Sequence, residues 1–118
     1  MTLSTTPYVK GLYSLGFSSD SSHFFTASQN GISIFSSQHA NLIYNINVRG
    51  GTAICDFCGI SNLFTFVPIF HPSSVIIWNC DSNSPLYQIV CSDLIVSIHC
   101  FVSSMQLLII LKSEIRIY

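Results

Sequence analysis

The sequence repeats one short ending three times: ISIF at 32–35, VIIW at 75–78 and IRIY at 115–118. Each ending joins β-branched residues to a final aromatic residue, a composition that favours β-strands. The aromatic residues stand 43 and then 40 residues apart. Four-stranded blades of a β-propeller recur every ~40–45 residues. The recurrence therefore predicts repeated sheet units of this kind.

Short apolar runs rich in Ile, Val, Phe and Tyr fill the chain around these endings, and none keeps a helical period. Clusters of Ser, Asn, Asp, Gly and Pro separate the runs, and Asn30-Gly31 is a good signal for a two-residue hairpin turn. The pattern predicts an all-β fold. Its expected strands are 12–17, 23–28, 32–36, 42–48, 53–58, 62–67, 75–79, 85–91, 95–101, 106–111 and 115–118.

Grouped by the repeat, these strands predict an N-terminal tail at 1–11 and a partial WD40-like β-propeller at 12–118. Its blades are expected at about 12–48, 53–91 and 95–118, the last without an outer strand. At ~40 residues a blade, these are about the first three blades of an expected seven. Whether the chain is a fragment, an incomplete gene model or a degenerate paralogue stays open.

The composition agrees with blades that are covered on both faces. Charged residues make up 8% of the 118 residues and apolar residues 49%, whereas a typical soluble domain is about 25% charged. A small β-sandwich is the alternative, but it would leave one face of each sheet wet and would need more charge. A membrane-spanning segment at 94–111 is a second alternative, which five polar residues interrupt.

Blades bury their faces only against neighbours. We therefore expect the first and third blades to leave one face uncovered each, and the isolated chain to pair with itself or aggregate.

The net charge of −1, with only four Lys and Arg residues, excludes the broad basic surface that nucleic acid or an anionic membrane would require. No signal peptide is expected at the N-terminus, and the five cysteines then favour a reducing compartment.

Cys55 and Cys58 form a CxxC motif, which leaves a small zinc or redox domain as a further alternative. Residues three apart in a strand point to opposite faces, so we expect these thiols to be separate packed side chains. His99, on an apolar strand, is expected to be a core residue. No nucleophile, base and orienting group come together in the sequence, so no enzyme and no cofactor are expected.

Seven short motifs follow one another after Pro7: FSSD at 17–20, GISIF at 31–35, GG at 50–51, AICD at 53–56, IWN at 77–79, LLIIL at 107–111 and EIRIY at 114–118. Their order and spacing resemble the amino-terminal part of the autophagy-related, phosphoinositide-binding WD-repeat propellers, the PROPPINs. The resemblance implies a non-enzymatic scaffold. In the intact protein it would bind phosphatidylinositol 3-phosphate, and the 3,5-bisphosphate, on autophagic or endosomal membranes from the cytoplasm and recruit autophagy proteins.

The sequence departs from this family where lipid would bind. The Phe/Leu-Arg-Arg-Gly lipid motif of a later blade is missing here, so the resemblance implies phosphoinositide binding only through blades outside these residues. The candidates for a partner-binding groove are Asp56, Ser103, Ser104 and Gln106. A protein-binding WD-repeat scaffold of another family remains the other function that the pattern allows.

Overall fold

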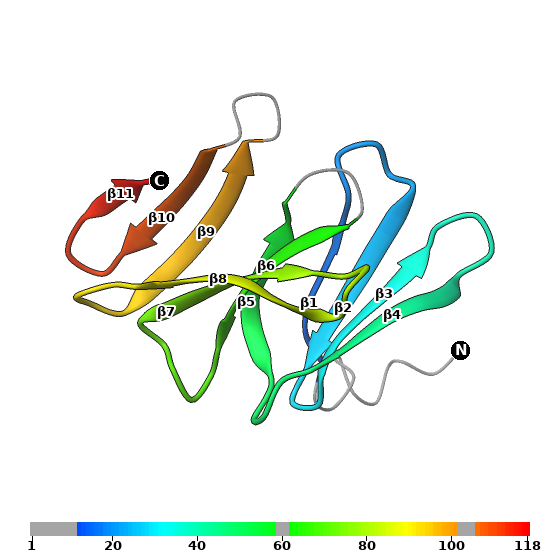
Figure 1. Cartoon of the computed structure of the whole chain (residues 1–118), viewed down its shortest axis with the longest axis horizontal. Helices are drawn as coiled ribbons and strands as arrows, with labels where there is room; N and C mark the ends of the chain where they lie inside the picture. Colours follow the sequence, from blue (N-terminus) through cyan, green and yellow to red (C-terminus); the bar gives the residue numbers. More distant parts are fainter. Residues whose placement is uncertain (1–11, 59–61, 102–105) are drawn as a thin grey trace, which may run out of the picture.

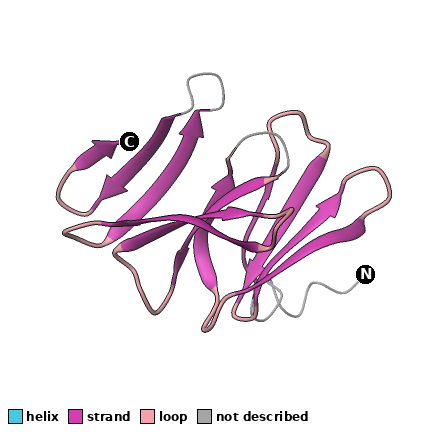
Figure 2. Cartoon of the chain, viewed as in Figure 1, coloured by secondary structure: helices cyan, strands magenta, loops and turns pink. Residues whose placement is uncertain are grey.

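The computed structural model describes residues 12–58, 62–101 and 106–118, and in this part of the chain it contains eleven strands and no helix. The strands form three sheets. Within each sheet, every strand pairs antiparallel with the strand that follows it in the sequence (Figures 1 and 2). The first sheet consists of β1 (Leu12–Phe17), β2 (His23–Ser28), β3 (Gly31–Ser36) and β4 (Asn41–Asn47).

The second sheet has the same order and the third has three strands. The second contains β5 (Thr52–Phe57), β6 (Leu63–Pro68), β7 (Ser74–Asn79) and β8 (Ser84–Val90). The third contains β9 (Ile95–Phe101), β10 (Gln106–Leu111) and β11 (Ile115–Ile117). The sheets stand side by side in chain order (Figure 1), and β5 contacts both β1 and β9. This is the arrangement of successive propeller blades, in which the first strands of the blades meet.

The fold class is confirmed: the chain is an all-β, partial WD40-like propeller. The eleven expected strands lie within a residue or two of the observed ones. The β-sandwich alternative is wrong, because the strands form three sheets rather than two. The segment at 94–111, weighed above as an alternative membrane span, instead contains β9 and β10, which pair antiparallel. No helix in the described part of the chain is long and apolar enough to cross a membrane.

Two hydrophobic cores lie between the sheets, one at each sheet-to-sheet interface. In each sheet we call the side toward the next sheet the forward face and the side toward the preceding sheet the rear face. The first core joins the forward face of the first sheet to the rear face of the second: Phe25, Ala27, Ile32, Ile34, Ile46, Val48, Phe57, Phe64, Phe66 and Cys80. The second core joins the second and third sheets: Val67, Val75, Ile95, Ile98, Leu107, Ile109 and Leu111.

The middle sheet is therefore covered on both faces, and β6 shows this most clearly. Phe64 and Phe66 are buried in the first core, while Val67 is buried in the second. Thr65, which lies between Phe64 and Phe66 in the sequence, is also fully buried. Strict polar–apolar alternation is lost because both faces are dry, which explains the low charge of the sequence.

The connection between the first and second sheets depends on glycine. Gly50 and Gly51 have φ values of 79° and 85°, in the left-handed region that a side chain disfavours. A Cβ atom on Gly51 would collide with the backbone carbonyl of Ser28. This turn brings β5 directly against the first sheet.

Candidate partner-binding groove

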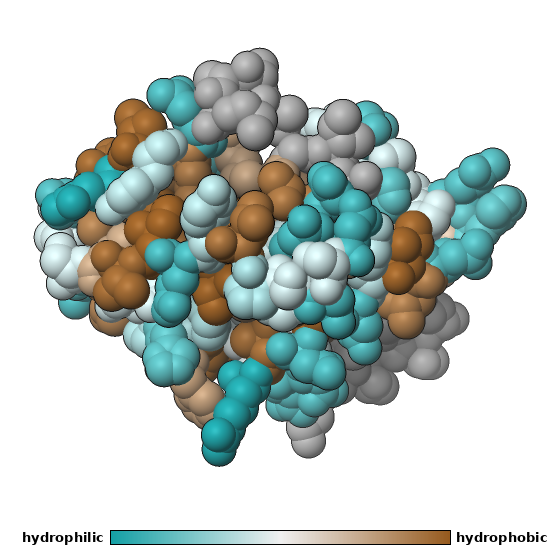
Figure 3. Space-filling view, in the orientation of Figure 1, coloured by the Kyte–Doolittle hydropathy of each residue, from teal (hydrophilic) through white to brown (hydrophobic). Residues whose placement is uncertain are grey.

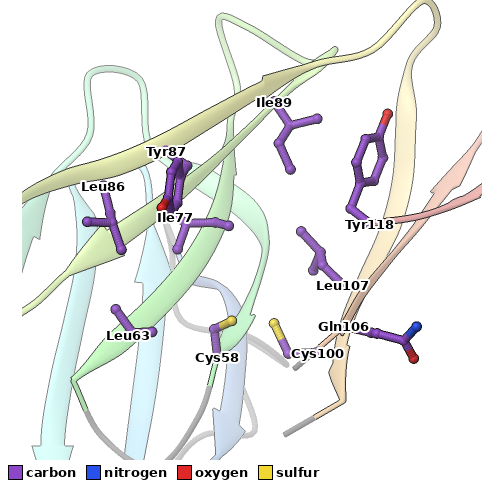
Figure 4. A pocket seen from close by; sticks show the side chains of 10 residues that line it. All are labelled: Cys58, Leu63, Ile77, Leu86, Tyr87, Ile89, Cys100, Gln106, Leu107 and Tyr118. Atoms are coloured by element: carbon purple, nitrogen blue, oxygen red, sulfur yellow. The ribbon is translucent and has the colours of Figure 1, made fainter. Parts of the chain in front are cut away.

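A cavity of about 240 Å³ lies between the second and third sheets (Figure 4). The second sheet and its flanks contribute Cys58, Leu63, Ile77, Leu86, Tyr87 and Ile89, and the third contributes Cys100, Gln106, Leu107 and Tyr118. Most of these side chains are aliphatic or aromatic. Such a lining suits an apolar side chain of a partner, with few polar groups to fix its orientation.

Leu86 and Tyr87 form the exposed side of this groove. They lie on β8, the edge strand of the second sheet, and 47% and 64% of their surfaces are accessible to solvent. Aromatic residues at the rim of an apolar cavity are frequent anchors in protein–protein interfaces. Leu86 and Tyr87 are not among the residues predicted from the sequence, although a large apolar pair beside Pro85 in an expected strand is a usable signal.

Cys58 and Cys100 face each other across the groove from different sheets (Figure 4). A hydrogen bond between the thiols lowers the pKa of Cys58 below its ordinary value. The same contact and burial raise the pKa of Cys100. Both cysteines are free. The two cysteines therefore form a thiol contact between two sheets. No local sequence motif predicts this contact.

Cys55 points the other way, as the strand geometry predicted. It packs against the first core, and burial raises the pKa of its thiol to about 12. Cys55 and Cys58 thus lie on opposite sides of the second sheet and do not form a joint site. Within residues 12–58, 62–101 and 106–118, no cluster of three or more His, Cys, Asp or Glu side chains could hold a metal ion.

Asp56 lies outside the groove, in a neighbouring cavity of about 250 Å³ between β5 and β9. Burial raises the pKa of this carboxyl group, against the opposing effects of the Phe57 backbone N–H and of His99. The Phe57 N–H donates to Asp56 Oδ1 over 2.9 Å. Asp56 is thus a half-buried acid on the first strand of its sheet.

The other predicted partner-binding residues separate into two groups. Gln106 begins β10 and lines the groove, whereas Ser103 and Ser104 lie outside the described residues. The expectation that His99 belongs to a core is wrong: it is exposed and its Nε2 lies 3.2 Å from Ser97 Oγ. It pairs with Leu108 on the forward face of the third sheet, which no described sheet covers.

A further cavity of about 360 Å³ lies between the first and second sheets, where Arg49, His71 and Trp78 are among the lining residues. The Trp78 Nε1–H is buried without a partner among the described residues. This cavity has a more polar rim than the groove.

Comparison with solved structures places the fold among WD40 propellers. Hsv2 of Kluyveromyces marxianus, a PROPPIN, superposes with a TM-score of 0.78 at 13% identity over 93% of this chain and 33% of its own. KlAtg21, solved with the coiled coil of AgAtg16, gives 0.74 at 18% identity over 92% of this chain and 36% of its own. The WD40 repeats of RRP9 give 0.69 at 14% identity, covering 86% and 33%.

The likeness to Hsv2 and Atg21 agrees with the resemblance to PROPPINs that the sequence shows. The chain has the fold of a partial, PROPPIN-like propeller. At these identities it shows the fold alone. The chain spans about a third of the length of these structures. No family model matches the chain, and no curated protein matches it in sequence.

Proposed function

We propose that this chain is part of a non-enzymatic propeller scaffold that binds autophagy proteins. The observation that carries the proposal is the apolar groove with Leu86 and Tyr87 at its rim, in a fold shared with Atg21, a protein solved with a coiled coil. An amphipathic helix places apolar side chains into such a groove and keeps its polar face in water.

In the intact protein this scaffold would act on the cytoplasmic side of autophagic or endosomal membranes. Binding of phosphatidylinositol 3-phosphate there would depend on sequence outside the 118 residues. The four Lys and Arg residues of the 118-residue chain are dispersed and include no Arg-Arg pair. Liposome flotation at physiological salt tests this point. Selective flotation of the 118-residue chain with phosphatidylinositol 3-phosphate would contradict it.

The partner proposal is tested with the AgAtg16 coiled coil as the immobilised probe in biolayer interferometry. Binding is expected for the unchanged chain, and Tyr87→Glu is expected to weaken it about tenfold or more, or about 1.4 kcal/mol, since aromatic residues that a partner buries are the usual anchors of an interface. Tyr13→Glu is the matched control, because Tyr13 is also exposed but lies on β1, away from the groove.

Two outcomes would contradict the proposal. One is equal affinity of the Tyr87 and Tyr13 variants, which places the contact elsewhere. The other is no binding of the unchanged chain to the coiled coil. In that case a WD-repeat scaffold of another family becomes the better proposal. The chain's likeness to the WD40 repeats of RRP9 is compatible with that alternative.

A further inference from the structure

The cavity of about 360 Å³ between the first and second sheets has a lining that the proposed function does not use. Its volume lies within the range of about 300–1,000 Å³ that is usual for small-ligand sites. The apolar lining residues are Val48, Phe66, Pro68, Phe70 and Ile76, and the polar ones are Asn47, Arg49, His71 and Trp78. None of the described lining residues is acidic. The cavity therefore places a cation and hydrogen-bond donors beside an apolar wall.

Arg49 and His71 come from two turns that lie next to each other. The Ile69 N–H donates to the Gly51 carbonyl oxygen over 3.0 Å, which ties the turn that carries Arg49 to the turn that carries His71. Both side chains are exposed. At the lower edge of the molecule, where these turns lie, polar side chains border apolar ones (Figures 1 and 3). Arg49 and His71 are thus held at the rim of the cavity.

Trp78 lines the same cavity from β7, and the centroid of its ring lies 6.1 Å from that of Phe66. The Trp78 Nε1–H is buried and has no acceptor among the described residues. Buried donors are almost always paired, because an unpaired donor loses its hydrogen bonds to water without compensation. An acceptor atom of a bound molecule would satisfy this N–H.

Arg49 forms no ion pair in the described part of the chain, although all five Asp and Glu residues lie there. The repeat of the fold does not explain this cation. Arg49 stands three residues before β5, whereas Ser92 stands three residues before β9 and is followed by Asp93. The turn into the third sheet therefore has an acid and no cation at the corresponding place.

We propose that this cavity binds a carboxylate carried on an apolar group, either a free organic acid or the C-terminal residue of a peptide. Arg49 pairs with the carboxylate, the Trp78 Nε1–H donates to it, and the apolar group packs on Phe66 and Ile76. A carboxylate has the single charge that one arginine balances, whereas a phosphate monoester carries nearly two. This inference stands independently of the proposed function, because the groove lies at the other sheet-to-sheet interface.

The test uses the full 118-residue chain and the fluorescence of Trp78, the single tryptophan of the sequence. The probe for a free acid is hydrocinnamate, a phenyl ring on a short chain that ends in a carboxylate. The probe for a peptide is an acetylated tripeptide that ends in phenylalanine with a free carboxylate. Each acid is expected to change the fluorescence saturably. The matched amide of each is expected to bind about tenfold more weakly or less, since it forms no ion pair.

Arg49→Gln is expected to weaken binding of both acids about tenfold, because it removes the charge that pairs with the carboxylate. Arg116→Gln is the matched control, since Arg116 is also a partly exposed arginine but lies on β11, away from the cavity. Circular dichroism checks that both variants retain their strands. In the unchanged chain, the Nε1–H proton resonance of Trp78 is expected to move downfield when either acid binds.

The two acids distinguish the sources: tighter binding of the tripeptide assigns a peptide terminus, and tighter binding of hydrocinnamate assigns a free acid. The inference is overturned if neither acid changes the fluorescence saturably, or if acid and amide bind the unchanged chain equally. Equal affinities of the Arg49 and Arg116 variants would also contradict it. Phenyl phosphate binding more tightly than hydrocinnamate would replace the carboxylate by a phosphate.

Discussion

Phe25 of β2 and Phe64 of β6 meet edge to face between the first and second sheets, with ring centroids 5.1 Å apart and planes at 72°. Phe57 adds a third ring, perpendicular to Phe64 at 5.2 Å. Edge-to-face contacts of this kind stabilise beyond the area that they bury. The cluster lies within the core that joins the first two sheets.

Phe64→Ala is expected to destabilise the chain by about 3–5 kcal/mol, because it leaves a cavity among rings that cannot collapse into it. Urea denaturation followed by circular dichroism measures the change. Phe70→Ala is the control, since Phe70 is mostly exposed in a turn, and it is expected to cost less than about 1 kcal/mol. Equal effects of the two changes would contradict the packing of the first core.

Gly51→Ala is expected to destabilise the chain more than Gly50→Ala. Both residues have positive φ, but the atoms nearest to a Cβ on Gly51 are backbone atoms of Ser28 and Gln29, whereas those nearest to a Cβ on Gly50 belong to the ring of Phe70. An exposed ring can move aside, and backbone at a sheet connection cannot. Thermal denaturation of the two variants compares them, and a larger loss for Gly50→Ala would contradict the geometry of the turn.

Cys58 and Cys100 are expected to form a disulfide on exposure to oxidised glutathione. The Cys58 thiolate attacks the glutathione disulfide and releases one glutathione thiolate. Cys100 then loses its proton, attacks the mixed disulfide and releases the second glutathione. The protein thiols are oxidised and glutathione is reduced. Titration of denatured protein should show a loss of two free thiols.

Cys58→Ser is expected to abolish this loss, and Cys100→Ser is expected to leave at most a loss of one thiol, as the mixed disulfide of Cys58 with glutathione. Cys55→Ser should leave the loss of two thiols unchanged, because Cys55 lies on the other side of the sheet. Peptide mapping identifies the linked pair. A Cys55–Cys58 disulfide would contradict the structure and revive the redox interpretation of the CxxC motif.

Asp20 is expected to titrate well below an ordinary aspartate. Hydrogen bonds from the Ser22 hydroxyl and backbone N–H and from the Ser18 hydroxyl lower its pKa to about 2. A lowered pKa in the folded state contributes stability above the ordinary pKa, and the contribution is lost as pH falls through the folded value. Carboxyl-carbon NMR should therefore show the Asp20 transition near pH 2, and a midpoint near pH 4 would contradict the turn.

The strands could be predicted from the sequence because their causes are local. β-branched and aromatic runs, the 43- and 40-residue spacings and the Gly50-Gly51 turn each act over a few residues. The opposite orientations of Cys55 and Cys58 followed from strand geometry in the same way.

The groove could not be predicted, since it depends on how one sheet packs on the next. Cys58 meets Cys100 only through that packing, and no spacing in the sequence encodes it. His99 was misplaced for a related reason: an apolar strand suggests burial, but which of its faces is covered depends on a neighbouring sheet.

Hydrogen exchange of the dilute chain, measured by peptide mass spectrometry, tests the central claim that three sheets stack face to face with the middle one covered on both sides. Amides slow to exchange should concentrate in β6 and β7, whose sheet has a core on each face, followed by β2 and β3. β10 and β11 should exchange fastest among the paired strands, because the third sheet contributes to one core only and has three described strands rather than four. Protection in β10 and β11 equal to or greater than that in β6 would contradict the account.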